Sequence, residues 1–242
     1  MPEPSDLAIA AAIAMTGAFA QGFLGFGFAI VAMAGLTVSR DLLQAAGVVN
    51  LTGILVAGSL LTALRREVLW RPALRIVPGV LVGVALGVSA LGSLDRDFMV
   101  RALGVTIAAI SLWNVRTPTL QTNEAPLRDG VTGLLGGILG GAFNTGGPII
   151  VAHLYRRPDP PQALKATNQL VFLSMGLSRL PIATAQGQIT SSIWVEAAII
   201  APFVLAGLLV GTRLGRRISP SAFRRVSWLA LGAMGVALVA SP

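Results

Sequence analysis

Two glycine-rich stretches, residues 22–28 and 136–148, lie deep inside hydrophobic segments of this chain. They read GFLGFGF and GGILGGAFNTGGP, and so many glycines, with a proline in the second, interrupt a regular helix. Each unpaired backbone amide or carbonyl group in hydrocarbon costs several kcal/mol, so broken backbone persists at membrane depth only where protein or a water-filled cavity satisfies it. The two stretches therefore predict a pair of broken membrane segments, an arrangement that is typical of a transporter's binding site.

The composition is that of a polytopic membrane protein. Hydrophobic residues make up 54% of the 242 residues and charged residues only 12%, half of the roughly 25% that soluble domains carry. Windows long enough to cross a hydrocarbon core as helix fall at 8–36, 43–64, 73–91, 99–115, 130–155, 163–184, 193–215 and 223–240. We therefore expect an all-α fold of eight hydrophobic helical segments in one transmembrane domain, residues 1–242, because no connection is long enough to hold a soluble domain.

The charged and reactive residues exclude several classes of function. Basic residues lie at the ends of the hydrophobic segments, so the pI of about 11.6 reports orientation in the membrane and not nucleic-acid binding. The chain has no cysteine and one histidine, so a metal centre or a histidine-supported nucleophile has too few parts. We expect no enzyme activity, no metal and no cofactor. The leader contains Glu3 and Asp6 but no basic residue, which argues against a cleaved signal peptide.

The two halves of the chain resemble each other. Matching residues occur in the same order and at similar spacing in residues 7–116 and 127–241. The matched pairs are Gly22 with Gly137, Leu24 with Leu139, Gly25 with Gly140, Phe28 with Phe143, Gln44 with Gln162, Asn50 with Asn168, Gly58 with Gly176, Trp70 with Trp194, Pro78 with Pro202, Gly83 with Gly207, and Gly87 with Gly211. The pattern indicates a duplicated unit of four segments, as in transporters that are built from internal repeats.

The first and fifth segments allow two topologies. If both cross the membrane, the basic residues are shared between the two sides of the bilayer. If each instead enters and returns on one side as a re-entrant hairpin, only Arg40, Arg96 and Arg101 lie opposite the other basic residues. The second topology fits the positive-inside rule better. It makes the two repeats inverted, with six spans, two hairpins and both chain ends outside; a kinked full span is the alternative.

Residues 144–148 are the best candidate for a ligand cradle. After Asn144 and Thr145, the glycines Gly146 and Gly147 expose successive amide groups, and Pro148 suits the first turn of a following helix. An anion would find amide donors and a helix N-terminus there. The alternative is that these glycines only let helices approach closely. We prefer that packing interpretation for the glycines that recur every four residues, which are Gly79, Gly83, Gly87, Gly207, Gly211 and Gly215.

Amide side chains are further candidates for the site. Asn50 and Asn168 hold equivalent positions in the two repeats, so inverted halves would bring both toward one central cavity. An amide donates to an oxyanion without carrying charge. Interhelical hydrogen bonding is an equally good reason for such residues. Gln21 and Gln169 belong to the same group of candidates.

Two ionisable residues are further candidates for the site or for coupling. Arg179, inside the sixth segment, carries a guanidinium that suits sulfonate or carboxylate oxygens. Its alternatives are to reach the membrane interface or to pair with Glu196. His153 is a candidate for proton coupling because histidine changes charge near neutral pH. A hydrogen-bonded side chain at the interface is the alternative there.

These residues give the chain a resemblance to the TauE/SafE family of membrane permeases, also called the sulfite exporter family. The elements that carry it are residues 22–30 (GFLGFGFAI), Asn50, Arg65, Arg66, Trp70, Arg71, residues 140–148 (GGAFNTGGP), Tyr155, residues 165–168 (KATN) and residues 179–187. The resemblance implies secondary transport of small sulfur-containing anions, such as sulfite, sulfoacetate or other organosulfonates, across the inner membrane. Alternating access would move two inverted halves around a site near the midplane.

The resemblance implies the small anionic substrate and the lipid bilayer as partners, with a homodimer as a further alternative. An anion channel, a transporter for small carboxylates and a non-transporting scaffold are the alternatives. One departure affects the site: many family members carry a Gly-Gly-Gly or Gly-Gly-Pro element in both halves, whereas here residues 26–30 read FGFAI and only the second half keeps Gly-Gly-Pro. We therefore expect the second half to contribute more of the site.

Overall fold

The computed structural model of the chain describes residues 4–38, 40–89 and 126–240, with a few residues between 105 and 112. Its helices are α1 (Pro4–Leu24), α2 (Phe28–Leu36), α3 (Leu42–Leu64), the 3₁₀ helix η1 (Arg65–Glu67), α4 (Trp70–Ser89), α6 (Pro126–Phe143), α7 (Gly147–Leu154), α8 (Pro161–Ala185), α9 (Ser191–Gly215) and α10 (Pro220–Ala240). The predicted segment at 99–115 lies almost entirely outside the described residues, as do Arg96, Arg101 and Arg116. The predicted first segment is the pair α1 and α2, and the predicted fifth is the pair α6 and α7.

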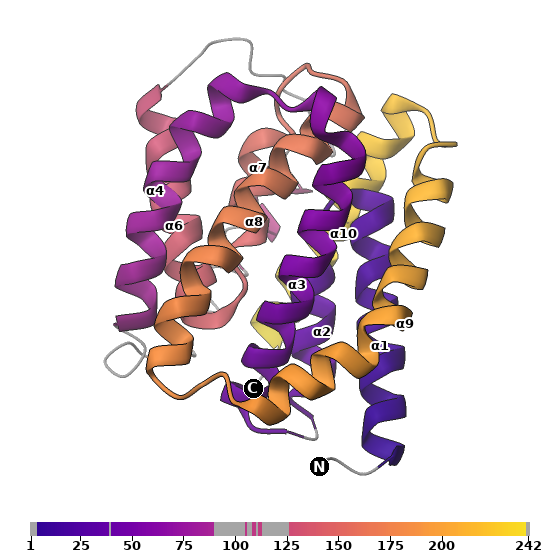
Figure 1. Ribbon diagram of the computed structural model, residues 1–242. Coiled ribbons are helices and arrows are strands. Elements are labelled where there is room, and N and C mark those ends of the chain that lie inside the picture. The colour runs from indigo at the N-terminus through magenta and orange to yellow at the C-terminus, as the bar shows by residue number, and fades with distance from the viewer. Residues whose placement is uncertain are drawn as a thin grey trace.

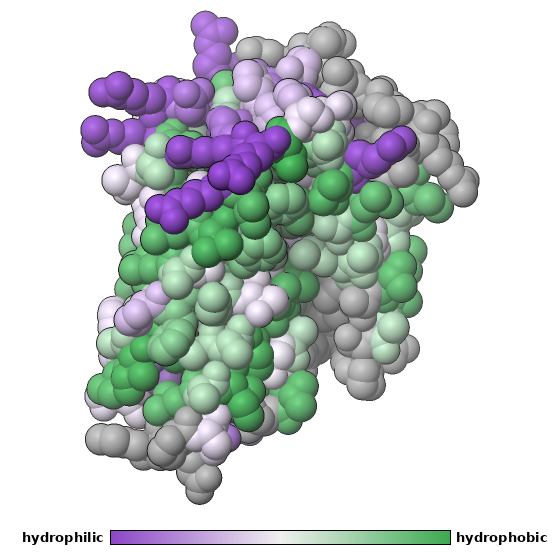
Figure 2. Space-filling model, turned by 90° about the vertical axis from the view of Figure 1, so that its right-hand side faces the viewer, coloured by the Kyte–Doolittle hydropathy of each residue, from purple (hydrophilic) through white to green (hydrophobic). Residues whose placement is uncertain are grey.

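The helices form a bundle that suits a membrane. Four stretches of the described chain are long and apolar enough to cross one, namely Ser5–Leu24, Leu43–Glu67, Trp70–Ser89 and Ser191–Gly215. Figure 2 shows the apolar surface, with hydrophilic side chains gathered in a band near one end. α8 is less apolar because it carries buried polar side chains, among them Asn168 and Arg179. The described residues are all-α, as the composition predicted, and four of their helical stretches are long and apolar enough to span a membrane.

Rows of glycine hold two pairs of helices in close contact. A Cβ atom added at any of these glycines would overlap the backbone of the facing helix. The rows are Gly79, Gly83 and Gly87 on α4, which face α6, and Gly207, Gly211 and Gly215 on α9, which face α1. In lipid, such close backbone approach is a main source of helix association, since lipid tails are as apolar as the side chains. The packing interpretation of these glycines is confirmed.

Each glycine-rich stretch ends one helix and starts a shorter one that runs back. α2 returns toward the end of the bundle where α1 begins, and α7 toward the opposite end, where α6 begins (Figure 1). Side-chain contacts agree with this course. Arg40, after α2, donates from Nη2 to the carbonyl oxygen of Asp6 at 3.3 Å. His153, in the last turn of α7, approaches Asp129 in the first turn of α6. Both broken segments are hairpins in the fold.

The turns inside the hairpins use left-handed backbone. Gly25 and Gly27 have φ values of 86° and 109°, and Asn144 has a φ of 57°. Glycine and asparagine adopt this region more readily than other residues. The residue types therefore place the chain reversals at these positions.

The two halves of the bundle have corresponding contacts. α1 packs against α9 as α6 packs against α4, and α2 lies on α3 as α7 lies on α8. α3 and α8 pack against each other in the centre. The N-termini of α2 and α7 consequently meet in the interior, between the two central helices.

Candidate functional site

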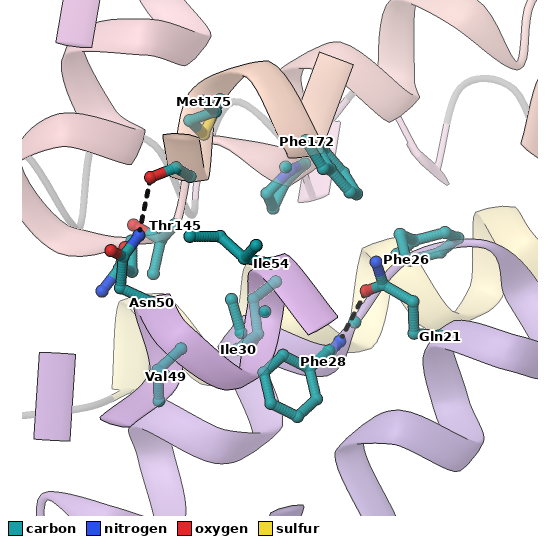
Figure 3. A pocket seen from close by; sticks show the side chains of 17 residues that line it. Gln21, Phe26, Phe28, Ile30, Val49, Asn50, Ile54, Thr145, Phe172 and Met175 are labelled. Atoms are coloured by element: carbon teal, nitrogen blue, oxygen red, sulfur yellow. Dashed lines mark hydrogen bonds between the residues drawn. The ribbon is translucent and has the colours of Figure 1, made fainter. Parts of the chain in front are cut away.

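A cavity of about 70 Å³ lies where the two helix breaks meet. This volume is several times the roughly 10–15 Å³ that one buried water needs, so the cavity has room for a small polyatomic ion. The residues that line it are Gln21, Phe26, Gly27, Phe28, Ala29, Ile30, Val49, Asn50, Gly53, Ile54, Asn144, Thr145, Gly147, Pro148, Phe172, Met175 and Gly176 (Figure 3). They come from both breaks and from α3 and α8.

The first wall of the cavity is the N-terminus of α2. Phe28, Ala29 and Ile30 form its first turn, in which the amide groups have no carbonyl partner within the helix. Gln21 holds this end in place: its Oε1 accepts the amide of Phe28 at 3.1 Å, and its Nε2 donates to Gln169 Oε1 at 2.8 Å. The Gln21 amide therefore positions this wall of the cavity, and both of its polar atoms are already engaged in hydrogen bonds within the protein.

The second wall is the N-terminus of α7. Gly147 starts this helix and Pro148 follows in its first turn, as the sequence predicted. Asn144 donates from Nδ2 to the carbonyl oxygen of Ala46 on α3 at 2.8 Å, which fixes the break against the other half. Gly146 does not line the cavity, because it packs against the backbone of Gly136 and Gly140 on α6.

Two polar side chains of the cavity keep unused hydrogen-bonding capacity. The Thr145 hydroxyl oxygen is buried and has no hydrogen-bond partner, and the same holds for Asn50 Oδ1. The Asn50 amide is otherwise held only by a 3.4 Å contact from Nδ2 to the carbonyl oxygen of Gly176. Figure 3 shows Thr145 and Asn50 at one end of the cavity and Gln21 at the other. A ligand that entered would find both groups available.

The electrostatics of the cavity come from backbone and not from side chains. The lining residues, all in the described part of the chain, include no charged side chain. Two helix N-termini face the cavity, and each carries roughly half a positive elementary charge. A helix N-terminus of this kind is a ready-made anion site. The remaining wall is apolar, from Phe26, Ile54, Phe172 and Met175 among others.

Asn168 and Gln169 lie outside the cavity and stabilise the first break. Both donate to the carbonyl oxygen of Gly25, at 2.7 and 2.8 Å. Lys165 donates to the carbonyl oxygens of Gly22 and Phe23, and Tyr155 to that of Leu24 at 2.6 Å. The carbonyl groups at the C-terminal end of a helix lack partners within it. Side chains from the second half thus satisfy the end of α1, a role that the sequence patterns alone did not reveal.

Arg179 also lies outside the cavity. It is 1% exposed, donates from Nε to the carbonyl oxygen of Gly141 at 3.1 Å, and contacts Gln188 Oε1 from Nη2 at 3.2 Å. Its Nη1 has no hydrogen-bond partner. Pairing with Glu196, one alternative raised by the sequence, is wrong because Glu196 binds Arg40 instead. In this conformation Arg179 supplies a hydrogen-bond donor to a carbonyl group near the C-terminal end of α6.

His153 belongs to a hydrogen-bonded pair that the sequence did not reveal. Its Nε2 lies 2.6 Å from Oδ1 of Asp129, which is buried. Asp129 and His153 are 24 residues apart, and only a hairpin brings the first turn of α6 next to the last turn of α7. The hairpin topology itself was therefore the signal that could have found the pair.

A helical bundle with apolar, span-length helices and a buried cavity between two broken helices is the arrangement typical of a membrane transporter. Comparison with known proteins agrees with this class. The chain belongs to the sulfite exporter TauE/SafE family, whose model matches residues 9–238. No solved structure matches the chain.

Two relatives of known name are similar over most of their length. One is the "Probable sulfite/organosulfonate exporter TauE" of Cupriavidus necator, 29% identical over 231 residues that cover 92% of this chain and 90% of that protein. The other is the "Probable inner membrane transporter protein TsaS" of Comamonas testosteroni, 30% identical over 176 residues that cover 72% of this chain and 73% of that protein.

Proposed function

We propose that the protein carries small sulfur-containing anions, such as sulfite, sulfoacetate or other organosulfonates, across the inner membrane by alternating access. The observation that carries this proposal is the cavity between the N-termini of α2 and α7, in which Thr145 and Asn50 keep buried polar atoms without partners. Backbone amides and the Thr145 hydroxyl would bind the oxygens of the anion. Bound there, the anion would be balanced by helix dipoles and not by a fixed cation.

The names of the relatives support the substrate class and the membrane. The Cupriavidus relative is named a sulfite/organosulfonate exporter and the Comamonas relative an inner membrane transporter. A sulfonate or sulfite group presents three oxygens around sulfur, with the charge spread over them, so several amide and hydroxyl donors can share it. The apolar wall around Phe172 and Ile54 would accept the carbon side of an organosulfonate.

Two inverted halves would provide the movement. The hairpin of α1 and α2 enters the bundle from one end and that of α6 and α7 from the other (Figure 1), and the contacts α1 to α9 and α6 to α4 correspond. Inverted repeats with broken helices that meet near the midplane are a recurrent basis of alternating access. The connections after α3, α7 and α9, which lie at one end of the bundle, would face the cytoplasm because most basic residues lie in them or in the helix ends beside them.

Counterflow in proteoliposomes tests the proposal. Vesicles are loaded with unlabelled sulfite, sulfoacetate, taurine, isethionate or acetate, and a trace of the labelled compound is added outside. We expect transient accumulation of label with the sulfur anions and none with acetate. A channel would equilibrate the label without an overshoot, and that result, or no flux from folded protein with any of the compounds, contradicts the proposal.

A further inference from the structure

α7 connects the cavity to a part-buried histidine–aspartate pair at one end of the bundle. Its N-terminal Gly147 lines the cavity, and its last turn places His153 Nε2 2.6 Å from Asp129 Oδ1. Asp129 is 2% exposed and its Oδ2 makes no hydrogen bond. Arg75 Nη1 of α4 lies 3.8 Å from that oxygen. These ionisable groups lie outside the cavity, and the binding of the anion does not use them.

Among the described residues, Asp129 is the one carboxylate within 4 Å of the His153 imidazole. Asp129 comes from α6, and Arg75 lies beyond it on α4. α8, the other long helix packed on α7, carries Lys165 and Arg179 as its charged residues. Lys165 is directed to carbonyl groups of α1, and Arg179 to Gly141. Asp129 is therefore the charged group that contacts the imidazole, with Arg75 beside its other oxygen.

The pair has the parts of a proton-binding site. A carboxylate only accepts hydrogen bonds, so neutral His153 must donate its Nε2–H to Asp129 and carry its lone pair on Nδ1. A proton from water would bind at Nδ1 and convert this hydrogen bond into an ion pair of His⁺ and Asp⁻. The positive charge would also lie at the C-terminal end of α7, where a helix dipole favours a cation.

We propose that the His153–Asp129 pair takes up and releases the proton that accompanies the anion. This inference rests on the proposed function. Protonation draws the last turn of α7 closer to α6. Because α7 is a single helix of 8 residues, a movement of its last turn also moves Gly147, its first residue, at the cavity. One proton with one monoanion moves no net charge across the membrane. By linkage, a bound proton then favours the bound anion and the reverse.

Proton-driven uptake and counterflow separate coupling from binding. Isethionate serves as the probe because its sulfonate does not titrate near neutral pH, so a pH gradient acts on the protein. With the outside acidic by one pH unit, we expect the original chain to accumulate isethionate up to about tenfold. His153→Gln and Asp129→Asn should show no accumulation above equilibrium while their counterflow persists. Asp159→Asn is the matched control, since Asp159 pairs with Arg157 at a more exposed position, and it should accumulate normally.

Several outcomes would overturn the inference. Normal gradient-driven accumulation in His153→Gln shows that the proton binds elsewhere. Loss of counterflow in folded His153→Gln shows that the pair belongs to anion binding and not to coupling. Counterflow without gradient-driven accumulation in the original chain removes coupling but leaves the proposed transport intact. Absence of counterflow with every sulfur anion contradicts the proposed function itself.

A spectroscopic measurement tests the proton site without transport. The chain has a single histidine, so protein labelled in its imidazole ring gives one histidine signal in NMR. We expect this signal to move with pH and again when a saturating sulfonate is added, and we expect Asp129→Asn to alter the movement with pH because the partner of Nε2–H is then an uncharged amide. A signal that does not change with pH, or that Asp129→Asn leaves unchanged, contradicts the assignment.

Discussion

The hydroxyl group of Thr145 is the residue-scale feature that best separates a binding role from a structural one. Buried polar groups in folded proteins nearly always have hydrogen-bond partners, but Thr145 Oγ1 has none, and it lines the cavity. Its neighbour Asn50 is in the same situation at Oδ1. An anion in the cavity would supply the missing acceptor for the hydroxyl proton. An anion therefore satisfies the Thr145 hydroxyl, whereas Asn50 Oδ1 is itself an acceptor and needs a donor group on the ligand.

Thr145→Val tests this interpretation because valine keeps the shape and removes the hydroxyl. No existing hydrogen bond is lost, so the thermal stability of the unliganded protein should stay the same or rise. Loss of a hydrogen bond to a charged ligand costs about 1.5–3 kcal/mol, which weakens sulfonate binding by about 10- to 100-fold. Equilibrium binding of labelled sulfonate to purified protein measures the change.

Thr167→Val is the matched control for that variant. The Thr167 hydroxyl is buried, accepts the amide of Leu69 at 2.9 Å and donates to the carbonyl oxygen of Ala163 at 2.8 Å. Its removal leaves a donor without partner and should lower stability by about 1–3 kcal/mol while sulfonate affinity is retained. If Thr145→Val binds sulfonate as the original chain does, Thr145 is not a ligand-binding residue.

At the scale of helices, the breaks were predictable and their partners were not. The glycine content of residues 22–28 and 136–148 predicts an interruption of the helix, and Pro148 predicts the start of α7. The backbone carbonyl groups at the first break accept hydrogen bonds from Lys165 and Asn168. These two residues lie more than a hundred positions later in the chain and reach the break only through the tertiary fold. For the same reason Asn50 and Asn168 look equivalent in sequence but differ in place: Asn50 lines the cavity, whereas Asn168 supports the break.

Close contact between α4 and α6 should be sensitive to a single methyl group. A Cβ atom at Gly137 would lie 2.5 Å from the carbonyl oxygen of Val80, so Gly137→Ala must push the two helices apart. We expect a loss of stability of about 1–3 kcal/mol. Gly130 is in the same helix with nothing within 4 Å of its position for a Cβ, and Gly130→Ala should be neutral or stabilising by up to about 1 kcal/mol. Unfolding midpoints in detergent compare the two, and equal stability would contradict the close packing.

At the scale of the whole molecule, the hairpins decide how the chain lies in the membrane. If α1 and α2 together formed a kinked full span, residues 5 and 41 would face opposite sides. In the fold, the contact between Arg40 and the Asp6 carbonyl group brings these two regions to one end of the bundle. The connection between α9 and α10 lies at the other end (Figure 1). The hairpin topology places the start of α1 and the end of α2 together on the outside, whereas a kinked full span places them on opposite sides of the membrane.

Single cysteines can distinguish the two topologies because the chain has no cysteine of its own. Ser5→Cys, Asp41→Cys and Ser219→Cys each place one thiol at an exposed position. We expect a membrane-impermeant maleimide to label the first two in intact cells and Ser219→Cys only after the membrane is opened, since the connection after α9 holds arginines that the positive-inside rule places in the cytoplasm. Labelling of Ser5→Cys and Asp41→Cys from opposite sides would mean that the first segment crosses the membrane. The two halves would then not be inverted, and alternating access would need a movement other than an exchange between equivalent hairpins.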